Sequence, residues 1–168
     1  MSQHPVPPPL LILIGDMTVS FARLELMMKG LFGSLIREHQ RLGQILSAEL
    51  SFSRLIDAII SLYQDRHGID DDFKLLRGLL TRAGVIEEER NSITHSFWGA
   101  SATPGAITRV KITSRRKQGY HVQFEEYDAI KLKAVVDEIK TLDDEIGKFH
   151  WEFIKKGKVI NNPFKRMW

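Results

Sequence analysis

Hydrophobic residues at helical spacing constrain the fold of this chain more than any other feature. Between Met17 and His39, apolar side chains recur three or four positions apart, which places them along one side of an α-helix. Similar stripes run through residues 51–68, 69–99 and 127–156. The residues of the first stripe are Phe21, Leu24, Met28, Leu31 and Leu35. The pattern therefore predicts three or four long helices.

The pattern changes to strict alternation after Gly99. The segments "ITRVKIT" and "YHVQFEE" alternate apolar and polar residues, and the polar stretch "SRRKQG" separates them. Alternation on both sides of a polar, glycine-ended turn is typical of a β-hairpin. We therefore predict a fold of the all-α class, an antiparallel up-down helical bundle, with a hairpin at about residues 106–125 inserted before the last helix.

A length of 168 residues favours a single domain. Near its start the chain reads "PVPPP", and proline restricts both its own backbone and that of the preceding residue. We therefore expect residues 1–14 to form an extended arm, with Asp16 capping the first helix. The helical domain is expected over residues 15–157, and residues 158–168 are expected to form a tail.

Composition excludes several kinds of site. The chain has no cysteine, which rules out disulfides and thiolate metal sites and agrees with a cytoplasmic location. The longest apolar run, Leu10 to Gly15, is too short to span a bilayer. A secretory signal has basic residues before its apolar run, and no lysine or arginine precedes this one. We therefore expect no membrane association. The net charge of +3 permits nucleic-acid binding without requiring it.

The stretch "EEERNSITHSFW", residues 87–98, interrupts an apolar helical stripe with polar residues. The spacing calls for an apolar side chain near position 90, where Arg90 stands instead. A guanidinium on such a stripe is costly unless it is paired or faces a solvated cleft. Asn91 and His95 are four residues apart and share a helix face. We therefore expect Arg90, Asn91 and His95 to converge near a helix end.

A cation, an amide and an imidazole in one place suit RNA cleavage without a metal. A histidine can take the proton from a ribose 2′-hydroxyl or give one to the leaving oxygen near neutral pH. An arginine offers a planar, permanent cation for the charge that develops on the phosphoryl oxygens. An asparagine can orient the imidazole or the phosphate. Arg90, Asn91 and His95 are therefore the candidate catalytic residues.

The segment "RNSITH" resembles the R-polar-x-x-x-H signature of the HEPN superfamily, and "HSFW" supplies the aromatic residue expected soon after the histidine. The resemblance implies a helical bundle and a metal-independent endoribonuclease of the kind found in toxin–antitoxin and phage-defence systems. It also implies a homodimer in which Arg90 and His95 of both copies line one composite cleft. No cofactor is expected. RNA is the implied substrate, and an antitoxin or regulatory protein is a further expected partner.

Each of these residues also has a structural interpretation. Arg90 could pair with Glu87, or with Glu25, which lies between apolar residues of the first helix and is an equally plausible supporting residue of the site. His95 could be a core histidine with its hydrogen bonds satisfied. A non-catalytic helical module that holds RNA or a protein in the same polar cleft is therefore the alternative function.

Basic residues of the hairpin are candidate contacts to an RNA backbone. They are Arg109 and Lys111 on one strand, with Arg115, Arg116 and Lys117 at the tip. The same charges could instead protect a strand edge from aggregation. The acidic stretch "DRHGIDDD" superficially suggests metal ligands, but a helix end followed by an N-cap explains it better. A metal-dependent hydrolase is therefore not favoured, and we expect no metal site.

Overall fold

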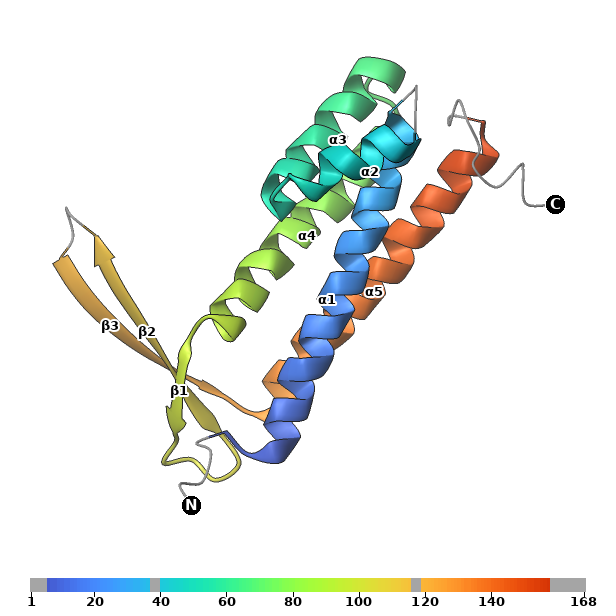
Figure 1. Ribbon diagram of the computed structural model, residues 1–168. Coiled ribbons are helices and arrows are strands. Elements are labelled where there is room, and N and C mark those ends of the chain that lie inside the picture. Colours follow the sequence, from blue (N-terminus) through green and yellow to red (C-terminus); the bar gives the residue numbers. More distant parts are fainter. Residues whose placement is uncertain (1–5, 37–39, 116–118, 158–168) are drawn as a thin grey trace.

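The computed structural model describes residues 6–36, 40–115 and 119–157; of residues 40, 113–115 and 119 only the backbone is described. Within these ranges the chain is mainly helical, with a small antiparallel sheet ahead of the last helix (Figure 1). This confirms the predicted class in outline. The elements are α1 (Pro8–Leu35), α2 (Gln40–Ala48), α3 (Phe52–His67), α4 (Asp71–Thr94), β1 (Phe97–Ala100), β2 (Ile107–Arg115), β3 (Gly119–Tyr127) and α5 (Ala129–Lys155).

Helix α1 begins earlier than expected, at Pro8. The predicted extended arm over residues 1–14 is therefore wrong for residues 8–14, while residues 1–5 lie outside the described residues. Proline is tolerated in the first turn of a helix because its missing N–H would have no partner there. Asp16 consequently lies inside α1, where it forms an ion pair with Lys140 of α5 (2.8 Å) instead of capping the helix.

Helices α3 and α4 are connected by a tight, capped junction. Gly68, with φ of 75°, ends α3 where the sequence predicted. Asp70 is the N-cap of α4: its carboxylate accepts hydrogen bonds from the N–H of Phe73 (2.7 Å) and from the hydroxyl of Tyr63 (3.2 Å). The capping interpretation of the acidic stretch is therefore confirmed for Asp70. Among the described residues, no group of three or more His, Cys, Asp or Glu side chains could hold a metal ion.

Helix α4 is continuous through Gly84 but ends at Thr94, five residues before the predicted stop at Gly99. The following residues form β1, a strand that the sequence analysis missed. Phe97 fits both a helical stripe and a strand, and only pairing with β2 decides between them. The sheet has the order β1-β2-β3, and its β2–β3 hairpin confirms and slightly extends the predicted one.

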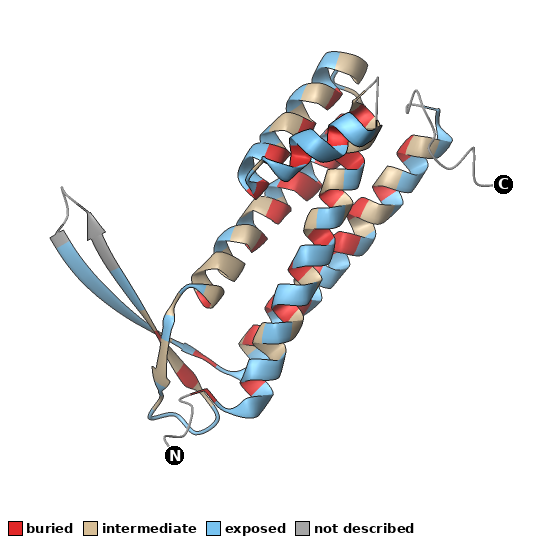
Figure 2. Cartoon of the chain, viewed as in Figure 1, coloured by how far each residue is buried: buried red, intermediate tan, exposed pale blue. Residues whose placement is uncertain are grey.

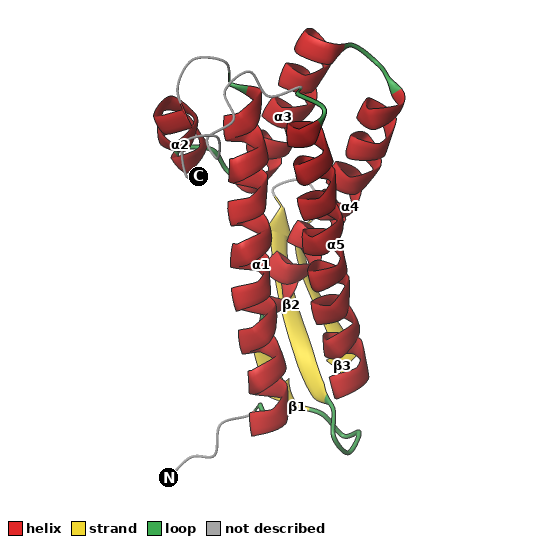
Figure 3. Cartoon of the chain, turned by 90° about the vertical axis from the view of Figure 1, so that its right-hand side faces the viewer, coloured by secondary structure: helices red, strands yellow, loops and turns green. Residues whose placement is uncertain are grey.

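Helices α1 and α5 lie side by side although they are far apart in the sequence (Figure 3). The pairs Asp16–Lys140 and Arg23–Asp143 (2.7 Å) show that the two helices run in the same direction. Consecutive helices alternate in direction: α2 and α4 run opposite to α1, whereas α3 and α5 run with it (Figure 1). Short connections predict antiparallel packing only for consecutive helices, so this parallel pair was not foreseen.

The core lies between the helices, and the outer half of the sheet stands away from it (Figure 2). Among the described strands, only the base of the sheet joins the core, through the buried Ile107 and Tyr127 and the half-buried Trp98. Helix α2 reaches α1 at a glycine contact: a Cβ on Gly43 would lie 2.8 Å from the Cα of Gly33. None of the helices described has the length and apolar character needed to cross a membrane.

Candidate functional site

The C-terminal end of α4 is held in place by the base of the sheet. The indole N–H of Trp98 donates to the carbonyl of Ile93 (3.1 Å), and the guanidinium of Arg109 donates to the hydroxyl of Ser92. The bond to Ile93 matters because the last carbonyls of a helix have no partner inside it. His95 occupies the C-cap position, and its N–H donates to the carbonyl of Asn91 (3.0 Å). The backbone that carries the candidate residues is therefore well supported.

Arg90 points from α4 toward α1. Its guanidinium carbon lies 4.1 Å from the centroid of the Phe21 ring, and the side chain is half-buried. Its Nε is buried and has no hydrogen-bond partner, and no carboxylate of the described residues lies within ion-pair distance of it. A half-buried guanidinium with this little compensation favours an incoming anion.

Two carboxylates lie near Arg90 without pairing directly with it. Glu87 hydrogen-bonds Asn91, and burial raises the pKa of the Glu87 carboxyl, against the opposing effects of Arg90 and Asn91. Glu25 forms an ion pair with Lys29 on its own helix (2.7 Å). The structural alternative of an Arg90–Glu25 ion pair is therefore wrong. Glu25 nevertheless lies close enough to add to the rise in the pKa of Glu87.

His95 is exposed, in the link between α4 and β1. The interpretation of His95 as a core histidine is therefore wrong. In the described part of the chain, no hydrogen bond connects the side chain of His95 with that of Arg90 or Asn91. The structure thus places the three residues within about one and a half turns, with Arg90 directed into the α1–α4 interface and His95 toward solvent.

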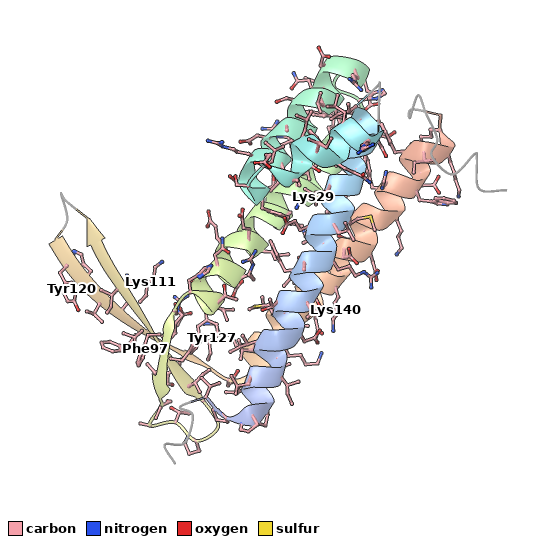
Figure 4. The ribbon with its side chains drawn as sticks, in the orientation of Figure 1. Lys29, Phe97, Lys111, Tyr120, Tyr127 and Lys140 are labelled. Atoms are coloured by element: carbon pink, nitrogen blue, oxygen red, sulfur yellow. The ribbon has the colours of Figure 1, made fainter. Side chains whose placement is uncertain are left out.

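The candidate RNA-binding residues of the sheet divide into different environments. Arg109 is only 9% exposed, and its guanidinium forms an ion pair with Glu125 (2.5 Å) in addition to the bond to Ser92. The positive charge of Arg109 is paired inside the protein. The expected surface contact of Arg109 with RNA is therefore corrected to a structural role. Lys111 is exposed on the side of the sheet that faces the helices (Figure 4). The side chain of Arg115, and all of Arg116 and Lys117, lie outside the described residues.

Sequence reasoning missed the neighbours that define this region. Phe21 was recognised only as a member of an apolar stripe, although its ring supports the guanidinium of Arg90. The bond from Trp98 to Ile93 depends on β1, which was not predicted. Only the spacing of Glu87 and Asn91, four residues apart on one helix, could have indicated their hydrogen bond in advance.

Comparison with protein-family models, with curated proteins and with solved structures finds no match to this chain. The case for a function therefore comes from the residues themselves. The relevant observations are a half-buried and incompletely compensated Arg90, an amide one residue further on, and an exposed histidine at the capped end of the same helix.

Proposed function

We propose that this protein is a metal-independent endoribonuclease of the HEPN type, acting as a toxin or phage-defence effector in the cytoplasm. The observation that carries the proposal is Arg90. Its guanidinium occupies a position that the helical stripe reserves for an apolar residue, and it has no ion-pair partner among the described residues. A cation kept in such a place is explained by an anionic ligand, and a phosphate group fits a guanidinium in a bidentate manner.

In the proposed reaction His95 takes the proton of a ribose 2′-hydroxyl, and the 2′-oxygen attacks the adjacent phosphorus. The bond to the 5′-oxygen breaks, and that oxygen takes a proton from water, while the protonated His95 returns its proton to the solvent. The products are a 2′,3′-cyclic phosphate and a 5′-hydroxyl. Arg90 stabilises the charge on the phosphoryl oxygens, and Asn91, oriented by Glu87, positions the phosphate or the imidazole. The side chains of Arg90 and His95 share no hydrogen bond in one chain, and the proposal includes a homodimeric bundle in which the residues of both copies form a composite cleft.

The test is cleavage of a mixed RNA pool in EDTA by the wild type and by His95→Ala. His121→Ala, at an exposed histidine of β3, is the matched control. We expect the wild type and the control to produce ends with 2′,3′-cyclic phosphate, which mass spectrometry identifies, and His95→Ala to produce none. Equal cleavage by all three proteins would overturn the proposal.

The second candidate is a non-catalytic module that binds RNA or protein in the same region. The absence of a hydrogen bond between the side chains of Arg90 and His95 within the described chain favours it over a preassembled active site. This function predicts no cleavage by the folded wild type, together with RNA binding that Arg90→Ala weakens and His95→Ala leaves unchanged. A filter-binding measurement on the same RNA pool distinguishes the two functions.

A further inference from the structure

The sheet has one apolar face that no part of the described chain covers. Residues paired directly across antiparallel strands project to the same side. The register pairs Phe97 with Val110 and Val110 with Phe124, and it also pairs Ile112 with Val122. We call the resulting surface the apolar sheet face; its members are Phe97, Val110, Ile112, Tyr120, Val122 and Phe124. Figure 4 shows Phe97 and Tyr120 directed away from the helices, whereas Lys111 and Tyr127 are directed toward them.

The exposure of this face is large for a single chain. Phe97 and Phe124 are each 71% exposed, and Tyr120 is 67% exposed. Scaling the roughly 150–250 Å² of an aromatic side chain by such fractions, with smaller amounts for the aliphatic members, gives about 600 Å² of apolar surface. The largest apolar patch of an ordinary monomer is about 300–600 Å² and often functional. The face is therefore at the upper limit of what a monomer exposes.

Charge distinguishes between protein and RNA as the occupant. By the strand register, no lysine or arginine of the sheet lies on the apolar sheet face. The only acid there, Glu126, accepts hydrogen bonds from Thr103 (3.0 Å) and Ser101 at the base of the sheet. Arg109, Lys111 and Glu125 all lie on the opposite side. RNA backbones need nearby cations, so the face favours a protein partner.

We propose that the apolar sheet face binds the same face of a second copy of this chain. A surface without lysine or arginine meets no repulsion between like cations when it packs on itself, and a two-fold axis covers both patches in one closed contact. Two such faces bury about 1,200 Å² in total, the lower limit for specific, stable interfaces. Sheets pack face to face in this manner in sandwich folds.

The position of the interface has a consequence for the candidate site. Phe97, a member of the apolar sheet face, stands two residues after His95. Association through this face therefore places each His95 near the rim of the contact, where the second copy can complete its surroundings. The dimer stands on its own observations and does not depend on the ribonuclease function.

The first experiment measures molar mass by sedimentation velocity over a range of concentrations. The wild type is expected at the mass of two chains of 19.3 kDa. Phe124→Glu and Tyr120→Glu are expected to raise the dissociation constant at least 100-fold. Leu26→Glu is the matched control, because Leu26 is a 70% exposed apolar residue on the outer side of α1. Circular dichroism must show that every variant remains folded.

The second experiment uses the absence of native cysteine. A single cysteine in Val122→Cys is expected to cross-link two chains through a short bis-maleimide, whereas Lys111→Cys on the opposite side of the sheet is not. A wild type that stays monomeric at 100 µM, or a dimer lost in Leu26→Glu but kept in Phe124→Glu, would overturn the proposal. The proposal would also be overturned if the protein bound RNA as a monomer and Phe124→Glu abolished that binding.

Discussion

The guanidinium carbon of Arg90 lies 4.1 Å from the centroid of the Phe21 ring, joining α4 to α1 just before the helix end that carries His95. Such a contact contributes on the order of 0.5–2 kcal/mol. The buried Nε without a partner acts in the opposite direction. The two effects are similar in size, so the fold gains little from this arginine.

Arg90→Met separates the two possible roles of the arginine. Methionine keeps the apolar contact with Phe21 and removes the unpartnered Nε, so the free energy of unfolding should change by less than about 1.5 kcal/mol. Cleavage of RNA should fall at least 100-fold, because the transition-state cation is lost. Urea unfolding and the EDTA cleavage assay measure the two effects. A large loss of stability with cleavage retained would assign Arg90 to the fold alone.

Glu87→Gln tests the carboxylate beside Arg90. Burial raises the pKa of Glu87 in the folded chain. The stability that the protonated carboxyl contributes is therefore fully present below the pKa of Glu87 in the unfolded chain, and it is lost as the pH rises through the pKa in the folded chain. At neutral pH the ionised group therefore disfavours folding. Glutamine retains a hydrogen-bonding oxygen for Asn91. We expect Glu87→Gln to be at least as stable as the wild type at pH 7, with a smaller advantage at pH 4, when both are followed by urea unfolding.

His150, which lies between α1 and α5, should make the stability of the folded chain depend on pH in the acid range. Its Nε2 lies 2.7 Å from the hydroxyl of Ser34, and burial lowers its pKa. The unfolded chain therefore binds the proton more readily, and stability should fall as the pH drops below the unfolded value of about 6.5. His150→Gln should lose less stability than the wild type between pH 7 and pH 5. Identical pH dependence of the two proteins in urea unfolding would contradict this coupling.

Two basic residues of one strand should behave differently when replaced by alanine. Arg109→Ala leaves the hydroxyl of Ser92 without this donor and Glu125 with Lys131 as its remaining ion-pair partner, and it should lower the free energy of unfolding by about 1–3 kcal/mol. Lys111→Ala removes an exposed charge and should change stability by less than about 0.5 kcal/mol. If Lys111 contacts RNA, its loss should reduce the slope of log affinity against log salt by about one. Unfolding and salt-dependent binding measurements on both variants check this contrast.

The extent to which the sequence predicted this structure depends on the range of the interactions involved. Helix α3 and the cap at Asp70 follow from local spacing and capping chemistry, and both were predicted. Strand β1 and the parallel pairing of α1 with α5 depend on contacts between distant residues, and neither was predicted. Local spacing likewise identified Arg90, Asn91 and His95 as candidates. The support of Arg90 by Phe21 depends on how two helices pack, which no spacing rule contains.

Paired glycines at the α1–α2 contact give the sharpest test of the packing. A Cβ at Gly43 would lie 2.8 Å from the Cα of Gly33, a distance that forces the backbone of one helix to move. A Cβ at Gly33 would meet no atom within 4 Å. Both residues are helical, so alanine adds about 0.8–1 kcal/mol of helix propensity at either position.

The two alanine substitutions should therefore change the free energy of unfolding in opposite directions. Gly33→Ala should raise the free energy of unfolding, by up to about 1 kcal/mol. In Gly43→Ala the clash should outweigh the propensity gain, because overpacking costs about 1–3 kcal/mol, and the result should be a net loss. Urea unfolding of both variants under one set of conditions measures the difference. A gain in both would mean that α2 does not press against α1 at Gly33, and that the short helix packs elsewhere.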